Sequence, residues 1–170
     1  IVGARPFPYV ATKVGATLDA AAHTYVQLCG HLVVELRGRR IEQRLPSRQG
    51  RAVFAYLVLE RPRAVGRDEL IDAIWAGTPP RDHTKALTVL LSKVRAAAGA
   101  DALVGRGSVR LVLPPDARVD VEQALAAGHR AESAVVQQDW TTAWSAALCA
   151  QYVAERPLLP ELDELPWLDA

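Results

Sequence analysis

Apolar residues recur at every second position once the first two dozen residues are past. Leu32, Val34 and Leu36 fall on one face of an extended chain, with mostly polar residues between them. This period of two predicts β-strands, and Gly38 can supply the positive φ of a turn after them. Residues 41–45 predict a further short strand, which ends at a proline. A small antiparallel sheet is therefore expected to open the folded part of the chain.

A helical period replaces the strand pattern after this sheet. Residues 48–60 are apolar nearly all round, which predicts a central helix with Ser47 as its N-cap. A second helix is expected over residues 67–75, with acidic residues in its first turn. Beyond a loop rich in glycine and proline, a third helix is expected to run to about residue 98, capped by Asp82 or a neighbour and closed by Gly99.

Two apolar arms around a glycine-rich tip follow the third helix in residues 103–113, a pattern typical of a β-hairpin. Pro114 and Pro115 then interrupt the pattern, and we expect the domain boundary there. Residues 119–138 and 141–154 are alanine-rich helical stretches with a short connection, which predicts an antiparallel helix pair. The apolar character of the last 14 residues indicates that the helical module is cut off within its structure.

The third predicted helix separates apolar side chains from basic ones. One side of a helical wheel holds the apolar residues, whereas the other side holds Arg81, Lys85, Thr88, Val89, Ser92, Lys93, Arg95 and Ala96. Its acidic residue, Asp82, lies in the first turn, so the outer face repels no phosphate. Positive charge combined with mostly short side chains suits a DNA major groove. The alternative is a slightly basic surface helix without a nucleic-acid role.

The net charge of +1 conceals two oppositely charged segments. Residues 31–113 carry 15 basic and 8 acidic residues, a net charge of +7, whereas residues 114–170 carry 3 basic and 10 acidic residues, a net charge of −7. This asymmetry indicates two modules with different partners. The alternative is that the two segments neutralise each other across an internal interface.

Several classes of function are excluded by what the sequence lacks. The longest apolar stretch, residues 53–59, is far shorter than a membrane span. Cys29 and Cys149 have neither disulfide-framework nor zinc-site spacing, so a reducing cytoplasm is expected. No catalytic triad, metal-ligand spacing or phosphate-loop motif is present, so we expect no enzyme, no metal and no cofactor. The four tryptophans are expected to be core residues rather than a ligand cage.

The order of the elements is that of a winged helix-turn-helix, in which the third helix enters the major groove and the hairpin contacts phosphates or the adjacent minor groove. Arg81, Lys85 and Arg95 are expected mainly to contact the DNA backbone. Base edges are expected to face Thr88, Val89, Ser92 and Lys93, and the hairpin contributes Arg106 and Arg110. The rival hypothesis is a protein-docking module with the same fold and no DNA.

The sequence also resembles SARP-type regulators of antibiotic pathways over residues 25–170. The resemblance rests on residues 26–30 and 32–34, 51–57, 68–75, Pro79 and Pro80, 86–95, 156–160 and 166–168. It departs from the family pattern at Ser108 and Val109, where a Gly-Tyr pair is usual, and at Lys93, where an arginine is usual.

The resemblance implies a domain organisation and a set of partners. After a tail or linker (residues 1–24), an OmpR-type α+β winged helix (25–114) would precede a truncated bacterial transcriptional activator domain (115–170) of all-α, tetratricopeptide-like helices. Members of the family bind promoter DNA, usually as side-by-side protomers on direct repeats, to activate biosynthetic gene clusters. The loop before the third helix touches RNA polymerase, a role that falls here on Gly77, Thr78, Pro79 and Pro80.

Overall fold

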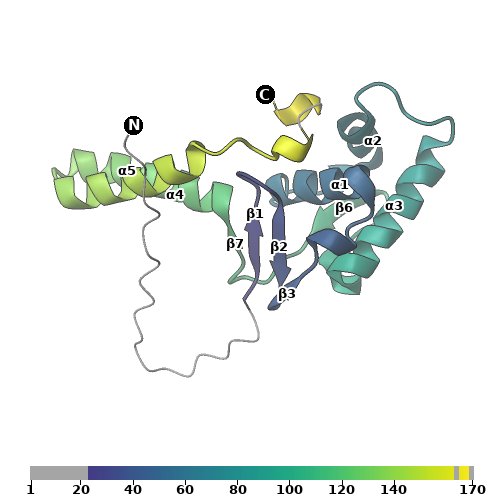
Figure 1. Ribbon diagram of the computed structural model, residues 1–170, viewed down its shortest axis with the longest axis horizontal. Helices are drawn as coiled ribbons and strands as arrows, with labels where there is room; N and C mark the ends of the chain where they lie inside the picture. Colours follow the sequence, from purple (N-terminus) through teal and green to yellow (C-terminus); the bar gives the residue numbers. More distant parts are fainter. Residues whose placement is uncertain (1–22, 163–164, 169–170) are drawn as a thin grey trace, which may run out of the picture.

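The computed structural model describes residues 23–162 and 165–168 of the chain (Figure 1). Three helices lie at one end, a pair of helices lies at the other, and a four-stranded sheet stands between them. Most of the expected N-terminal tail or linker, up to residue 22, lies outside the described residues. None of the helices described is both long enough and apolar enough to pass through a bilayer.

The first sheet has the strand order β3-β2-β1-β7, in which β7 (Arg118–Val119) comes from much later in the chain. Strands β1 (Tyr25–Gln27), β2 (Val33–Leu36) and β3 (Arg39–Arg40) are antiparallel neighbours, as the period of two predicts. The turn between β2 and β3 contains Arg37 and Gly38 with φ of 51° and 74°, the left-handed conformations that a tight hairpin turn requires.

The strand predicted over residues 41–45 is wrong. The segment instead forms a 3-10 turn, η1 (Glu42–Arg44), directly after β3. Ile41 and Leu45 are 3% and 4% exposed, and a helical turn brings residues four positions apart to the same face, so that both reach the core. The Glu42 carboxylate accepts hydrogen bonds from the Val34 amide and the Arg40 guanidinium, which holds the turn against the sheet.

Three helices pack into one apolar core. They are α1 (Ser47–Leu59), α2 (Arg67–Trp75) and α3 (His83–Ala98). Helix α1 is central as predicted, because Val53 and Phe54 are fully buried. The predicted N-cap role of Ser47 is wrong: Ser47 is the first helical residue, with φ of 56°, and its hydroxyl donates to the Gln49 amide oxygen. The Asp82 cap of α3 is confirmed, since its carboxylate accepts from the Lys85 amide at 3.1 Å.

The predicted hairpin forms from β5 (Leu103–Val104) and β6 (Ser108–Leu111). A third strand, β4 (Val65–Gly66), precedes α2 and pairs with β6. The sequence pattern did not predict β4, because two residues are too short for an alternation. The result is a helix-turn-helix whose wing is anchored to the segment that leads into α2.

After the wing the chain returns to the first sheet. Strand β7 (Arg118–Val119) pairs in parallel with β1, and α4 (Asp120–Val136) begins at once. Helix α5 (Trp140–Ala154) packs along α4 as the predicted antiparallel partner, and Asp139 caps its first turn by accepting from the Thr142 amide. The architecture is thus a winged helix-turn-helix followed by helices, as the sequence predicts.

A buried carboxylate joins the helix pair to the sheet. Asp120 is 2% exposed, and its two oxygens accept from the amides of Leu28 and Cys29, each at 2.9 Å. The guanidinium of Arg156 lies 3.9 Å from the same carboxylate. Burial, together with the charge of Asp120, raises the pKa of the Cys29 thiol above its ordinary value, so Cys29 stays protonated at neutral pH.

The apolar tail packs on the winged helix. It contains two 3-10 turns, η3 (Pro160–Leu162) and η4 (Pro166–Leu168). The Leu159 amide donates to the Leu28 carbonyl at 2.9 Å, and Leu162 is fully buried in the common core. Trp167 donates its indole N–H to the Ala73 carbonyl of α2 at 3.0 Å. The apolar residues that indicated an interrupted helical module therefore cover the sheet, α1 and α2.

The core assignment of the tryptophans is wrong for two of them. Trp140 and Trp144 are 64% and 70% exposed, and with Leu148 and Tyr152 they follow α5 at intervals of four residues. Trp75 and Trp167 are partly buried against the core. Helix α5 turns its small residues toward α4, and this leaves the large ones on the outer face.

Candidate nucleic-acid interface

The outer face of α3 and the loop before it are open to solvent. Among the residues predicted to contact DNA, Arg81, Lys85, Thr88, Val89, Ser92 and Lys93 are exposed, whereas Arg95 is half-buried. The opposite face places Leu87, Leu91 and Val94 in the core at 1% exposure or less. One helix therefore divides cleanly into a packing face and a basic outer face.

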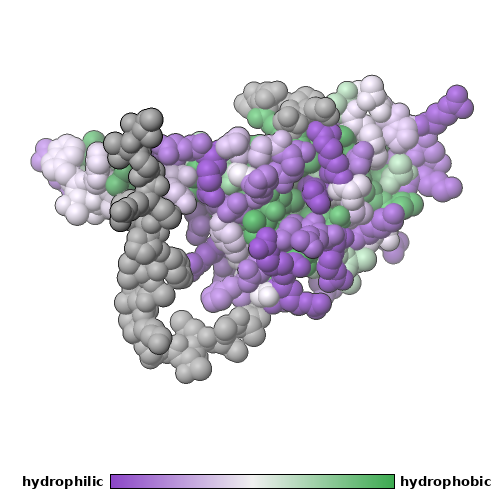
Figure 2. Space-filling view, in the orientation of Figure 1, coloured by the Kyte–Doolittle hydropathy of each residue, from purple (hydrophilic) through white to green (hydrophobic). Residues whose placement is uncertain are grey.

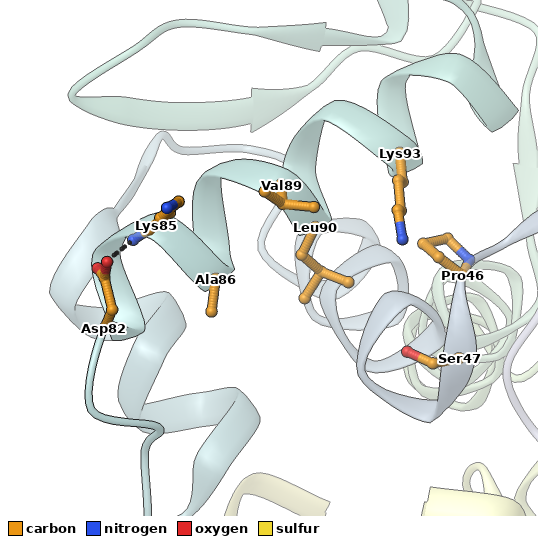
Figure 3. A pocket seen from close by; sticks show the side chains of 8 residues that line it. All are labelled: Pro46, Ser47, Asp82, Lys85, Ala86, Val89, Leu90 and Lys93. Atoms are coloured by element: carbon orange, nitrogen blue, oxygen red, sulfur yellow. Dashed lines mark hydrogen bonds between the residues drawn. The ribbon is translucent and has the colours of Figure 1, made fainter.

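A groove runs along one flank of this face. It has a volume of about 700 Å³ and lies between α3 and the start of α1, where Pro46 and Ser47 form the opposite wall. Lys85, Val89 and Lys93 contribute the α3 side, and Figure 3 shows Lys93 extending across the groove toward Pro46. The groove is thus bordered by two positively charged side chains, Lys85 and Lys93, and by the apolar side chain of Val89.

The wing lies along the other flank, and Arg95 fixes it there. The Arg95 guanidinium donates to the carbonyl oxygens of Leu103 at 3.2 Å and Gly105 at 2.9 Å. The sequence prediction gave Arg95 a role in contacting the DNA backbone. In the structure two of its N–H groups hold the first arm of the wing against α3, and contact between Arg95 and DNA stays a prediction.

A second arginine, which the sequence analysis missed, joins α3 to the wing tip. Arg67, the first residue of α2, donates to the Thr88 hydroxyl at 2.6 Å, to the Thr84 carbonyl at 3.3 Å and to the Arg106 carbonyl at 3.4 Å. No sequence signal marks this role, because Arg67 stands beside two acidic residues and reads as an ordinary first-turn residue. Together, the two arginines set the geometry between helix and wing.

The side chains of Arg106 and Arg110 project from the wing and are exposed. Hydrophilic residues also cover the end of the molecule opposite the helix pair, where the loop between α2 and α3 lies (Figure 2). Basic groups therefore occupy both the helix and the wing, and the gap between them is bridged by protein hydrogen bonds. A double helix lying along α3 would meet both sets of groups.

Gly105 is expected to be indispensable to the wing. Its φ is +101°, and a Cβ at this position would lie 2.0 Å from the Ser108 carbonyl oxygen. We expect Gly105→Ala to cost about 1 to 3 kcal/mol through backbone strain and this clash, measured by chemical denaturation. Gly107→Ala is the matched control, since nothing lies within 4 Å of its Cβ position. Equal stability of the two variants would contradict the expectation.

The predicted polymerase-contact loop is also exposed. Ala76 ends α2 in the left-handed conformation and Gly77 continues it, with φ of 45° and 82°. Thr78 closes the turn through its amide and its hydroxyl, which both donate to the Trp75 carbonyl. Pro79 and Pro80 then extend the loop into solvent. Hydrogen bonds thus close the start of the loop, and its tip is accessible.

Comparison with known proteins gives two informative similarities, although no family model matches the chain. The chain is 32% identical over 97 residues to the regulatory protein AfsR of Streptomyces griseus, a match that covers 51% of this chain and 10% of AfsR. The solved structure of Mycobacterium tuberculosis EmbR in complex with a low-affinity phosphopeptide matches with a TM-score of 0.75 and 25% identity. That match covers 86% of this chain and 40% of the EmbR chain.

AfsR is a SARP regulator and EmbR is an OmpR-like regulator of the same family. The chain is similar to SARP-type regulators in both sequence and fold. The match to EmbR also confirms the fold class, a winged helix-turn-helix followed by a helical part. The chain spans a small part of AfsR and less than half of EmbR, so the SARP-type likeness concerns this portion of each protein.

Proposed function

We propose that this chain is a sequence-specific DNA-binding transcriptional regulator that activates a biosynthetic gene cluster. Helix α3 lies in the major groove, and the wing contacts the adjacent backbone or minor groove. The observation that carries the proposal is the exposed basic face of α3, flanked by a wing that two arginines hold in place. Similarity to AfsR and EmbR supports the regulatory role.

The charge distribution favours DNA over an acidic protein surface as the partner. Arg81, Lys85 and Lys93 are exposed, and none of them forms an ion pair within the described part of the chain. Phosphate contacts supply affinity by releasing counterions, and exposed unpaired cations can do this at little desolvation cost. The short side chains between them let the helix backbone approach the base edges.

Replacing Lys85 tests the electrostatic part of the proposal. We expect Lys85→Ala to weaken binding to all DNA sequences about equally and to reduce the slope of log affinity against log salt by about one. Fluorescence anisotropy of a labelled duplex across a salt series measures both quantities. Arg130→Ala is the control, because Arg130 is an exposed arginine on α4, away from the interface. A salt-independent affinity would favour a docking module instead.

Two further roles follow from the family resemblance and belong to the same proposal. The exposed loop containing Thr78, Pro79 and Pro80 contacts RNA polymerase, and two protomers bind side by side on direct repeats. The hydrogen-bonded start of the loop and its exposed tip support the first role. Substitution of the loop is expected to abolish promoter activation in vitro while leaving the anisotropy signal for DNA unchanged.

A protein-docking function is the second candidate, and one observation favours it. The outer face of α5 exposes Trp140, Trp144, Leu148 and Tyr152, and the helix carries no charged residue from Trp140–Ala154. Such apolar patches mark interaction sites. This surface lies on the helix pair, at the opposite end from α3 (Figure 1), so docking and DNA binding can coexist in one chain.

A further inference from the structure

The hydroxyl of Thr88 is already committed within the protein. Its proton is donated to the Thr84 carbonyl at 2.8 Å, and its oxygen accepts from the Arg67 guanidinium at 2.6 Å. A hydroxyl has one proton to give, so Thr88 has no donor left for a base edge. Although Thr88 lies on the exposed outer face, its polar group is turned back onto its own helix and onto α2.

What remains of Thr88 for a partner is its methyl group. The next residue, Val89, is 48% exposed and has only apolar side-chain atoms. Core packing does not explain why Thr88 and Val89 present apolar groups, because the side of α3 that packs into the core contains Leu87, Leu90 and Leu91 instead. Two exposed side chains of the basic face therefore offer apolar groups to a partner, Thr88 on the flank beside the wing and Val89 on the flank beside the groove.

We propose that α3 recognises the 5-methyl groups of thymines in the major groove through Thr88 and Val89, with Arg67 as the residue that positions Thr88. The inference rests on the proposed DNA-binding function and adds the base chemistry that the helix reads. Thymine is the DNA base that displays a methyl group in the major groove, and small apolar side chains pack against it. Because Arg67 donates to the Thr88 hydroxyl oxygen, the methyl group is the part of Thr88 that meets the DNA.

The experiment uses duplexes selected from random DNA by the complete chain. Each thymine of the selected site is replaced in turn by deoxyuridine, which removes the methyl group and leaves base pairing unchanged. We expect about a fourfold loss of affinity at each thymine that packs against Thr88 or Val89, the value of burying one methyl group. Where a cytosine replaces such a thymine, 5-methylcytosine is expected to recover part of the lost affinity.

A matched pair of variants separates the methyl group from the hydroxyl. Thr88→Val keeps a methyl surface and removes the hydroxyl, so it should retain the deoxyuridine penalty. Thr88→Ser keeps the hydroxyl and removes the methyl, so the penalty should vanish at one thymine position. Val89→Ala should reduce the penalty at a neighbouring position. Both positions are exposed, and unchanged circular dichroism spectra of the three variants would show that the fold is kept.

Arg67→Lys tests the positioning role without changing the charge. A lysine cannot form the planar fork that joins the Thr88 hydroxyl to the carbonyls of Thr84 and Arg106. We expect an unchanged salt slope and a weaker thymine preference, because the Thr88 hydroxyl oxygen, no longer occupied by Arg67, can accept a hydrogen bond from other bases. In the Thr88→Val background the same change should leave the thymine preference intact. Arg63→Lys, on the loop before α2, is the control.

The outcomes distinguish this inference from the function on which it rests. If the chain binds no duplex at low salt, the DNA-binding function itself is wrong. If it binds, and deoxyuridine costs nothing at any position, methyl recognition is overturned while DNA binding stands. If Thr88→Val abolishes the preference and Thr88→Ser keeps it, the hydroxyl reads the base and the assignment of Arg67 is overturned too.

Discussion

Asp120→Ala is expected to lower the free energy of unfolding by about 3 to 5 kcal/mol, since each buried N–H group left without an acceptor costs about 1 to 3 kcal/mol. The variant strands two such groups, the amides of Leu28 and Cys29, which both donate to this carboxylate. It also removes a negative charge from the first turn of α4, where the helix dipole favours an anion. Urea denaturation followed by circular dichroism measures the loss.

Asp116→Ala provides the matched control, because Asp116 is an exposed aspartate in the loop before β7. Its expected effect is within about 0.5 kcal/mol, the usual range for an exposed site. Asp120→Asn should fall between the two, since one amide oxygen still accepts while the NH₂ group faces a backbone donor. A wild-type midpoint for Asp120→Ala would show that the junction between sheet and helices contributes little to stability.

Leu162→Ala is expected to cost about 2 to 5 kcal/mol, the range for removing a large aliphatic side chain from a core. Leu162 is fully buried, and it lies in the 3-10 turn η3, which follows the wing only after β7, α4 and α5. The loss therefore measures how far the tail belongs to the core of the winged helix. Chemical denaturation measures the loss. A spectroscopic probe placed in the winged helix and the circular dichroism of the whole chain should report the same unfolding transition.

Leu148→Ala is the comparison for this effect. Leu148 is the same residue type on α5, but it is 46% exposed, so its truncation leaves no cavity. We expect little change in its unfolding midpoint. Two separate transitions in the Leu162→Ala variant, with the winged helix unaffected, would contradict the shared core.

The long periodic segments of the fold were predictable from the sequence. Residues 48–60 and 82–98 carry a helical period over three or more turns, and a hairpin pattern surrounds the wing tip, so each signal is repeated several times. Strands β4 and β7 have two residues each and carry no period. Their positions depend on the strands beside them, which tertiary packing brings together.

The tail shows the same limit in another form. Its leucines are apolar enough to predict burial, but their spacing does not say against what they are buried. The four tryptophans were treated alike by residue type, although packing leaves Trp140 and Trp144 outside and places Trp167 beside Ala73. Residue type predicts a preference for burial, whereas the partner surface decides it.

The basic face was predictable residue by residue, whereas its internal hydrogen bonds were not. A helical wheel gives the side on which Lys85, Thr88 and Lys93 lie, since it depends only on sequence spacing. The bonds from Arg67 and Arg95 to the wing join residues that are 8 to 39 positions apart, so they depend on how the elements pack. DNA contact by these residues stays a prediction, to be tested by the affinities described above.

Strand β7 and the tail both come after the wing in the chain, yet both complete the part that precedes it. A chimera that transfers the winged helix of this protein and joins it to another protein at Pro114 and Pro115 would lack β7, the edge strand of the first sheet. It would also lack the tail that packs over Leu28. A stable chimera must instead place its junction beyond Leu168, so that the winged helix, the helix pair and the tail are transferred together.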